Sequence, residues 1–176
     1  PGSPERTVFM TQDKKFFQTH FFKLDRYRVS ADKLSADEPE TNEAVVKITV
    51  PAKEAEGKID RKFRAEIQPD NKKFLALTAT SHGDGTVDAL DRALRRLLEP
   101  IYPFMKSIRL IRYEVQSTQR REGTSSKVEV FILAANKDGK LYFSEVASVS
   151  VIEASFSALA NIYNRFYVDE YCGAEE

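Results

Sequence analysis

The hydrophobic and polar positions of this chain follow one pattern that occurs twice. Residues 24–29 (LDRYRV) return as residues 110–115 (LIRYEV), with Leu, Arg, Tyr and Val in the same places. Each copy continues into an alternating stretch, at 44–50 and 126–132, and then into a short apolar stretch, at 74–80 and 141–149. Alternation and β-prone residues are typical of strands, so the pattern predicts three strands in each copy.

A helical pattern closes each copy. Residues 87–94 match residues 152–159, and an acidic residue stands in the first turn of both, where the helix dipole favours negative charge. The predicted apolar sides consist of Val87, Leu90, Leu94, Leu97 and Leu98 in the first helix and of Ile152, Phe156, Leu159, Tyr163 and Phe166 in the second.

This order of elements predicts an α+β fold of two βββα units related by internal pseudo-symmetry, with antiparallel sheets each covered by a helix. The units differ in their loops. The first carries a charged segment at 51–71, whereas the second turns at 136–139, where Asn-Lys-Asp-Gly is typical of a hairpin.

The expected domain organisation is a single compact domain, because 176 residues are few for two independent cores. We expect residues 1–15 to be a cloning remnant or a disordered lead-in and residues 169–176 to be a tail. Residues 16–168 form the domain, with the first unit at 16–103 and the second at 104–168. Phe16, Phe17, Phe21 and Phe22 suit core packing or a partner surface.

Composition excludes several classes of protein. The net charge is zero, which gives the chain as a whole no attraction to nucleic acid or to an anionic membrane, and no apolar run approaches the length of a membrane span. The single cysteine, Cys172, has no internal disulfide partner, and no secretory signal is visible, so we expect a cytoplasmic protein. The chain has only two histidines, and it has no nucleophile motif. The sequence therefore points to no catalytic site and to no metal site.

The segment 81–86 (SHGDGT), between a strand and a helix, is the strongest local candidate for binding. Its glycines would allow close approach, and the N–H groups of the first helical turn suit a carboxylate or a phosphate. A tight turn capped by Asp84 or Thr86 explains the same residues.

A basic patch with neighbouring tyrosines would instead indicate an RNA- or DNA-binding module. Solvated helix and loop charge is the simpler interpretation, because two of these arginines are spaced to pair with Asp88 and Asp91. The arginines concerned are Arg92, Arg95, Arg96, Arg109, Arg112, Arg120 and Arg121.

Several motifs, taken together, resemble the C-terminal regulatory domain of the 2-isopropylmalate and citramalate synthases. They are residues 83–90 (GDGTVDAL), 108–110 with Tyr113 and Val115, 123–124, and 152–155 with Ala158. The resemblance runs from about Phe22 to Tyr167, and residues 89–103 are closer to the citramalate branch.

The resemblance implies a domain that forms a homodimer and binds a branched-chain amino acid as feedback inhibitor, leucine in the isopropylmalate enzymes and isoleucine in the citramalate enzymes. The parent enzymes condense acetyl-CoA with a 2-oxo acid on a metal-dependent barrel of the same polypeptide. That barrel would hold the divalent metal and the acetyl-CoA, so no catalytic residue and no cofactor is expected on this domain.

The resemblance also implies an effector site at the dimer interface. The matching positions are Gly83, Asp84, Gly85, Val87, Leu110, Tyr113, Ser148, Ser150 and Ile152. Four residues depart from the family's usual ones, Thr86 for Pro, Val146 for Gly, Ser150 for Asp or Asn, and Arg112 for Asp. Such changes would alter the choice of effector or leave a purely structural dimerisation domain, which is the alternative function.

Overall fold

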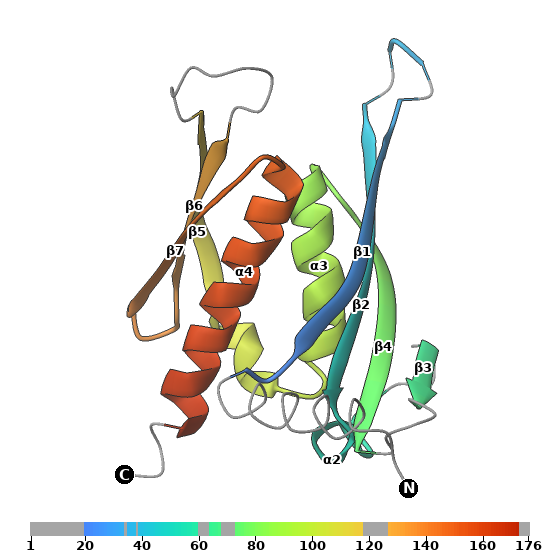
Figure 1. The fold of residues 1–176 in the computed structure, drawn as a ribbon, viewed down its shortest axis with the longest axis vertical. Helices are drawn as coiled ribbons and strands as arrows, with labels where there is room; N and C mark the ends of the chain where they lie inside the picture. Colours follow the sequence, from blue (N-terminus) through green and yellow to red (C-terminus); the bar gives the residue numbers. More distant parts are fainter. Residues whose placement is uncertain are drawn as a thin grey trace, which may run out of the picture.

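The computed structural model describes residues 20–33, 35–37, 39–59, 64–67, 73–117 and 127–172, with the backbone alone at 64–67 and 171–172. The predicted lead-in at 1–15 and the last four residues of the predicted tail lie outside these ranges. Within them the predicted fold class is confirmed, because two antiparallel sheets are each followed by a helix (Figure 1).

The first unit contains a four-stranded sheet in the order β1-β2-β4-β3. A short strand, β3, and a short helix, α2, lie in the charged segment for which no element was predicted. Strand β3 pairs with the side of β4 that β2 leaves open, and it thereby covers part of an exposed sheet edge. The elements are β1 Lys23–Asp32, β2 Thr41–Pro51, α2 Ala52–Ala55, β3 Arg64–Ile67, β4 Phe74–Gly83 and α3 Thr86–Leu98.

The second unit contains a three-stranded sheet in the order β5-β6-β7. The predicted hairpin turn is confirmed: Gly139 has a φ of 81°, and Asn136 Oδ1 accepts hydrogen bonds from the backbone of Asp138 and Lys140. The elements are the 3₁₀ helix η1 Pro103–Ser107, β5 Arg109–Ser117, β6 Val128–Ala135, β7 Leu141–Ser148, α4 Val151–Tyr167 and the π-helical turn η2 Val168–Cys172.

A shared irregularity supports the internal repeat. The pairing of β1 with β2 shifts between Leu24 and Arg26, and the pairing of β5 with β6 shifts between Leu110 and Arg112. These are equivalent residues of the two repeats, so Asp25 and Ile111 are bulged at the same place. The units therefore share a backbone detail that the sequence pattern did not predict.

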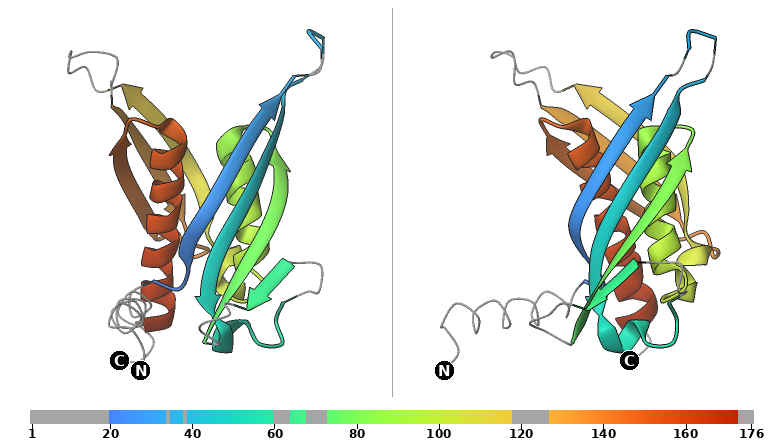
Figure 2. Two further views of the ribbon diagram at one scale, coloured as in Figure 1. Left: turned by 45° about the vertical axis from the view of Figure 1, so that its right-hand side comes forward. Right: turned by 90° about the vertical axis from the view of Figure 1, so that its right-hand side faces the viewer.

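The two helices lie between the two sheets (Figures 1 and 2). Helix α3 covers β2 and β4, helix α4 covers β6 and β7, and the helices contact each other in the middle. The predicted apolar sides are confirmed: Leu90, Leu94, Leu97 and Leu98 of α3 are buried, as are Phe156, Leu159, Tyr163 and Phe166 of α4. Val87 and Ile152, at the helix starts, are half-buried.

Phe21 and Phe22 belong to this core, each with 2% of its surface exposed. The ring of Phe21 lies 4.8 Å from both Tyr102 and Tyr167, and its backbone N–H donates to Asn164 Oδ1 at 3.2 Å. The segment before β1 therefore fastens α4 to the connection between the units. Phe16 and Phe17 lie outside the described residues. No helix among the described residues is long and apolar enough to cross a membrane.

Candidate functional site

Both helices begin at the same end of the molecule, the upper end in Figure 1. The predicted effector segments 83–87 and 148–152 therefore lie at one end, because each leads into a helix. Tyr113 contacts the helix that follows the second segment, since its hydroxyl lies 2.9 Å from Ser155 Oγ on α4. The hydrogen bonds described for 83–87 stay within the first unit. Leu110 packs against the core.

Gly83 permits a close contact between β4 and helix α3. A Cβ atom at Gly83 would lie 2.3 Å from the backbone nitrogen of Ala89 and 2.7 Å from Asp88 Oδ2. The Asp88 carboxylate accepts a hydrogen bond from the backbone N–H of Asp84 at 2.9 Å and pairs with Arg92. Glycine is therefore required at this position by the packing of the protein itself, whether or not a ligand binds.

The two helix starts differ in how they are capped. Gly85 precedes α3 and offers no side chain, so no side-chain oxygen caps the first turn. Ser150 precedes α4, and its Oγ accepts a hydrogen bond from the backbone N–H of Glu153 at 3.3 Å. Glu153 in turn accepts from Ser148 Oγ at 2.5 Å. Helix α3 thus leaves more of its N-terminal donors for an external anion than α4 does.

An exposed apolar surface surrounds the start of α4. It is formed by side chains of β5, of the loop before α4 and of the first residue of α4, and we call it the Tyr113 surface. Its members are Tyr113 (41% exposed), Val115 (42%), Val149 (65%) and Val151 (36%). Tyr113 and Val115 point toward the helix layer, yet about two-fifths of each stays exposed in the described chain. Clustered exposure of this kind makes the Tyr113 surface a candidate for binding.

The four departures from the family's usual residues have definite places. Val146 packs against the core, Ser150 caps α4, and Thr86 is the first residue of α3. Arg112 pairs with Glu114 at 2.7 Å. Because neighbouring residues of a strand face opposite sides, Arg112 lies on the far side of the sheet from Tyr113. Arg112 is therefore remote from the Tyr113 surface.

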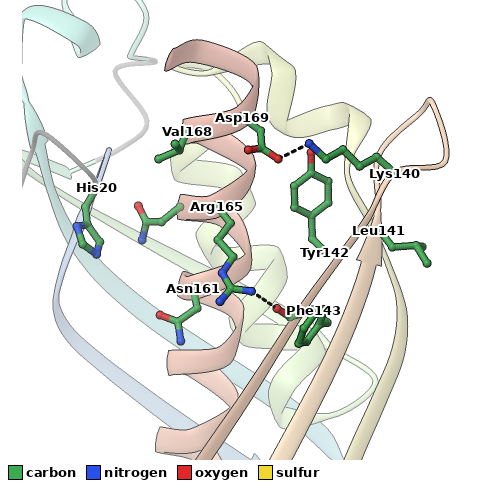
Figure 3. Close-up of a pocket in the computed structure, with 10 residues that line it drawn as sticks. His20, Lys140, Leu141, Tyr142, Phe143, Asn161, Arg165, Val168 and Asp169 are labelled. Carbon is green, nitrogen blue, oxygen red and sulfur yellow. Dashed lines mark hydrogen bonds and ion pairs between the residues drawn. The ribbon is translucent and has the colours of Figure 1, made fainter. Parts of the chain in front are cut away.

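A hollow of about 520 Å³ lies at the other end of the molecule, between the β6–β7 hairpin and the end of α4 (Figure 3). The sequence did not predict it, because a hairpin and a helix end form it together, and none of the predicted site residues lines it. The hollow is lined by His20, Lys140, Leu141, Tyr142, Phe143, Asn161, Asn164, Arg165, Val168 and Asp169.

Charged groups in this hollow pair with one another. Lys140 Nζ lies 2.6 Å from Asp169 Oδ2, and Arg165 donates to the backbone oxygen of Phe143 at 2.8 Å (Figure 3). Burial, aided by the charge of Asp169, raises the pKa of the Tyr142 hydroxyl. These contacts connect the β6–β7 hairpin to the end of α4 and the η2 turn.

A buried polar cluster joins the two units. The Tyr163 hydroxyl of α4 donates to Asp91 of α3, and Arg95 Nε lies 2.9 Å from Asp91 Oδ2. Arg95 also donates to the backbone oxygens of Met105 and Ile108. Burial, aided by the Asp91 charge, raises the pKa of Tyr163 well above its usual value. We call Asp91, Arg95 and Tyr163 the inter-unit cluster.

The arginines considered for nucleic-acid binding do not gather on one described surface. Arg95 lies in the inter-unit cluster, Arg92 pairs with Asp88, and Arg96 donates to the backbone oxygen of Thr80 at 2.7 Å. Arg109 and Arg112 lie on the opposite unit, in β5. Arg120 and Arg121 lie outside the described residues. Nor do three His, Cys, Asp or Glu side chains group together in the described chain as a metal site requires.

Three relatives share extensive sequence with this chain, and all are (R)-citramalate synthases. The protein of Aquifex aeolicus is 36% identical over 140 residues, which are 79% of this chain and 22% of the relative. That of Geobacter sulfurreducens is 29% identical over 148 residues, 83% of this chain and 24% of the relative. That of Streptomyces coelicolor is 39% identical over 87 residues, 49% of this chain and 16% of the relative.

This chain thus spans less than a quarter of the length of these relatives. Residues 4–167 match the family described as the LeuA allosteric (dimerisation) domain, which agrees with the resemblance seen in the sequence motifs. The match takes in both βββα units, the two helix starts and the Tyr113 surface. The chain therefore belongs to the LeuA allosteric (dimerisation) domain family.

Proposed function

We propose that this domain is the feedback-regulatory part of a citramalate- or isopropylmalate-type synthase. In this proposal it binds isoleucine or leucine at the Tyr113 surface, and a second copy completes the site. The condensation of acetyl-CoA with a 2-oxo acid, and the divalent metal it uses, belong to a barrel elsewhere in the parent polypeptide. The observation that carries the proposal is the exposed Tyr113 surface in a domain of this family.

A free branched-chain amino acid needs three kinds of contact: donors for its carboxylate, acceptors for its ammonium group and an apolar surface for its side chain. The uncapped first turn of α3 after Gly85 offers donors. The side chain of Asp84 is 99% exposed and offers an acceptor. Tyr113, together with Val87 and Ile152, offers apolar surface.

The Tyr113 surface is open in a single chain, which supports the part assigned to a second copy. Small-molecule sites cover most of the ligand's surface, whereas Tyr113 and Val115 are each about two-fifths exposed. A copy placed over them would supply the missing wall. This arrangement also couples ligand binding to assembly, because the ligand stabilises only the assembled form.

Isothermal titration with isoleucine and with leucine tests this function. We expect one of them to bind wild-type protein, and Tyr113→Ala to weaken that binding at least tenfold. Tyr113→Phe should bind nearly as well, because it keeps the ring and loses only the hydroxyl contact with Ser155. Arg28→Ala, on the outside of the first sheet, is the remote control. Silence with both amino acids at millimolar concentration would contradict the sensing function.

A purely structural dimerisation domain is the second candidate. The observation that favours it is that Ser150 and Val146, two of the departures, serve the fold as a helix cap and as core packing. Light scattering would then give the same dimer with and without either amino acid, and the titrations would show no heat of binding.

A further inference from the structure

The outer face of the first sheet, turned away from the helices, carries a cluster of positive charge. Arg26 and Arg28 stand two residues apart on β1 and therefore point to the same side of the sheet. Lys47 of β2 lies opposite Arg26 in the strand pairing, and it faces outward because its neighbours Val46 and Ile48 are buried under the helices. The right-hand view of Figure 2 looks onto this face.

The three cations surround a hollow of about 240 Å³, which Val45 and Thr78 also line. Val45, Lys47 and Thr78 are half-buried, whereas Arg26 and Arg28 are exposed. The hollow therefore combines half-buried strand residues with two exposed arginines, and it has room for several water molecules or for a small anion. We call these five residues the cationic hollow.

Among the described residues, neither Arg26 nor Arg28 has a carboxylate partner. Asp25 precedes Arg26, but its Oδ2 accepts a hydrogen bond from the Thr49 hydroxyl at 2.6 Å. Two positive charges held on one side of a strand repel each other, and an anion between them removes that repulsion. The two arginines thus have unused capacity for an anionic ligand.

The second unit balances the same position differently. In the repeat, Arg112 is equivalent to Arg26, and Glu114 is equivalent to Arg28. Arg112 Nε donates to Glu114 Oε1 at 2.7 Å, so the charge of that arginine is neutralised within the chain. The first unit carries a second cation where the second unit carries the carboxylate. Its counter-charge therefore comes from outside the repeat.

Neighbouring carboxylates limit the size of the ligand. Glu43 lies in the next row of the sheet beyond Arg28, where its Oε2 is 3.5 Å from His82 Nε2, and Asp25 lies beside Arg26. The positive surface covers only two rows of the sheet, which is too short for the series of phosphate contacts that nucleic acid makes. A small anion fits this extent.

The chemistry of the lining favours phosphate oxygens. Guanidinium groups present planar pairs of N–H donors that match the oxygens of a phosphate group, and a lysine adds a point charge. The Thr78 hydroxyl can donate a further hydrogen bond. The cationic hollow has no aromatic residue on which a nucleotide base could stack. The lining thus suits the phosphate part of a ligand above any other part.

We infer that the cationic hollow binds a small anion that carries a phosphate or diphosphate group, with Arg26 and Arg28 holding its oxygens and Lys47 adding a third positive charge. The site faces away from the helices, whereas the Tyr113 surface belongs to the other unit and faces the helix layer. It goes beyond the proposed function, because binding of an amino-acid effector does not depend on it.

Isothermal titration with pyrophosphate tests the inference. Wild-type protein should bind pyrophosphate at low salt and bind it more weakly when sodium chloride is added, because salt screens exposed charges. Inorganic phosphate should bind more weakly than pyrophosphate, since it has fewer oxygens for the two arginines. Silence with pyrophosphate at millimolar concentration would overturn the inference.

ADP distinguishes the two sources of a diphosphate group. Binding of ADP as tight as that of pyrophosphate would support a site for organic phosphates that leaves the nucleoside in solvent. Binding of pyrophosphate without ADP would support a site for inorganic phosphates.

The sharpest variant is Arg28→Glu, because it copies Glu114 of the second unit onto the first, where the repeat already shows that such a pair is accepted. It should lower the affinity for pyrophosphate at least tenfold, and Arg28→Gln should lower it less, because it adds no negative charge. Arg112→Gln is the matched control on the second sheet and should bind like wild type. Equal affinities of wild type and Arg28→Glu would overturn the inference.

Two further measurements place the anion and separate it from the effector. In NMR titrations with pyrophosphate, the amide signals of Arg28, Val45 and Thr78 should shift, while those of β6 and β7 stay unchanged. The reverse pattern would overturn the inference. Arg28→Glu should keep its thermal unfolding and its binding of isoleucine or leucine, whereas Tyr113→Ala should lose the amino acid and keep pyrophosphate.

Discussion

Arg26, Lys47 and Thr78 lie side by side on the outside of the first sheet, and Arg112, Leu133 and Phe143 occupy the equivalent places on the second. The backbone pairing is the same in both, including the bulge before each arginine. The side chains nevertheless produce a polar, cationic face in one unit and an apolar face in the other. The two faces must therefore meet different surroundings.

The inner sides of the two sheets, in contrast, carry similar residues. Val46 and Ile132 occupy equivalent inner positions, and both are fully buried. The inner residues are restricted because they must pack against a helix, whereas the outer residues contact only solvent or a partner. The sequence repeat is visible mainly in inner residues such as Leu24 and Leu110 for this reason.

Tyr27 and Tyr113 show that equivalent inner residues can also diverge. The ring of Tyr27 stacks on Phe156 of α4 with centroids 5.2 Å apart, whereas Tyr113 stays 41% exposed. In the first unit the tyrosine is used for packing between the units. In the second the tyrosine stays partly exposed.

The largest expected effect comes from the inter-unit cluster, where the helices differ most. Asp91 of α3 occupies the position that Phe156 holds in α4. We expect Asp91→Ala to lower the free energy of unfolding by about 3–5 kcal/mol, because it removes the carboxylate that accepts from Tyr163 and leaves the largely buried Arg95 only the more distant Glu99. Urea denaturation followed by circular dichroism measures this change.

Asp88→Ala is the matched control, since it breaks a more exposed pair with Arg92 one turn earlier and should cost about 1 kcal/mol. Equal losses for the two alanine variants would show that the cluster does not join the units.

The next largest effect concerns the helix starts, where Gly83 of the first unit corresponds to Ser148 of the second. Gly83→Ala forces a Cβ to within 2.3 Å of the Ala89 nitrogen and should cost about 3 kcal/mol. Ser148→Ala removes two hydrogen bonds, one donated to Glu153 and one accepted from the backbone N–H of Ser150, and should cost about 1–2 kcal/mol. Thermal unfolding of both variants compares them, and a harmless Gly83→Ala would refute the close contact of β4 with α3.

A smaller effect depends on pH. Tyr163 of α4 corresponds to Leu98 of α3, and burial raises the pKa of its hydroxyl well above the value of about 10 in the unfolded chain. The folded state then holds the proton more tightly. The hydrogen bond to Asp91 thus contributes fully below about pH 10 and is lost as the pH rises further.

Tyr163→Phe should therefore cost about 2 kcal/mol at pH 8, and the difference from wild type should shrink above pH 10. Urea denaturation at a series of alkaline pH values measures the difference. A gap that stays constant up to pH 11 would show that Tyr163 does not hold its proton more tightly in the folded protein.

The sequence predicted most of the fold, because alternation and helical periodicity record which side of each element is buried. The sequence did not predict β3. This strand forms because the edge of β4 is open for pairing, and its own residues contribute little signal. The sequence also presented Asp91–Arg95 as an ordinary helix-surface pair, although Tyr163 from 72 residues away buries it. Burial by a distant element leaves no signal in local spacing.

For the candidate site, the sequence located the two helix starts and Tyr113 but not the exposure around them. Val149 and Val151 are exposed because neither α4 nor the sheet covers them. That exposure results from packing, which local sequence does not show. The apolar outer side of the second sheet was missed for a similar reason. Phe131, Leu133 and Phe143 fit an apolar strand equally well from either side, and only the register shows which side faces out.

The smallest effect on stability is expected on the outside of the first sheet, where the comparison can be reversed. Lys47→Leu with Thr78→Phe copies the second unit onto the first and should change the free energy of unfolding by less than about 0.5 kcal/mol, as surface substitutions do. Urea denaturation followed by circular dichroism measures this change. A loss of more than about 1 kcal/mol would show that the outside of the first sheet restricts its side chains more than an exposed surface does, and the two outer faces would then differ in packing as well as in polarity.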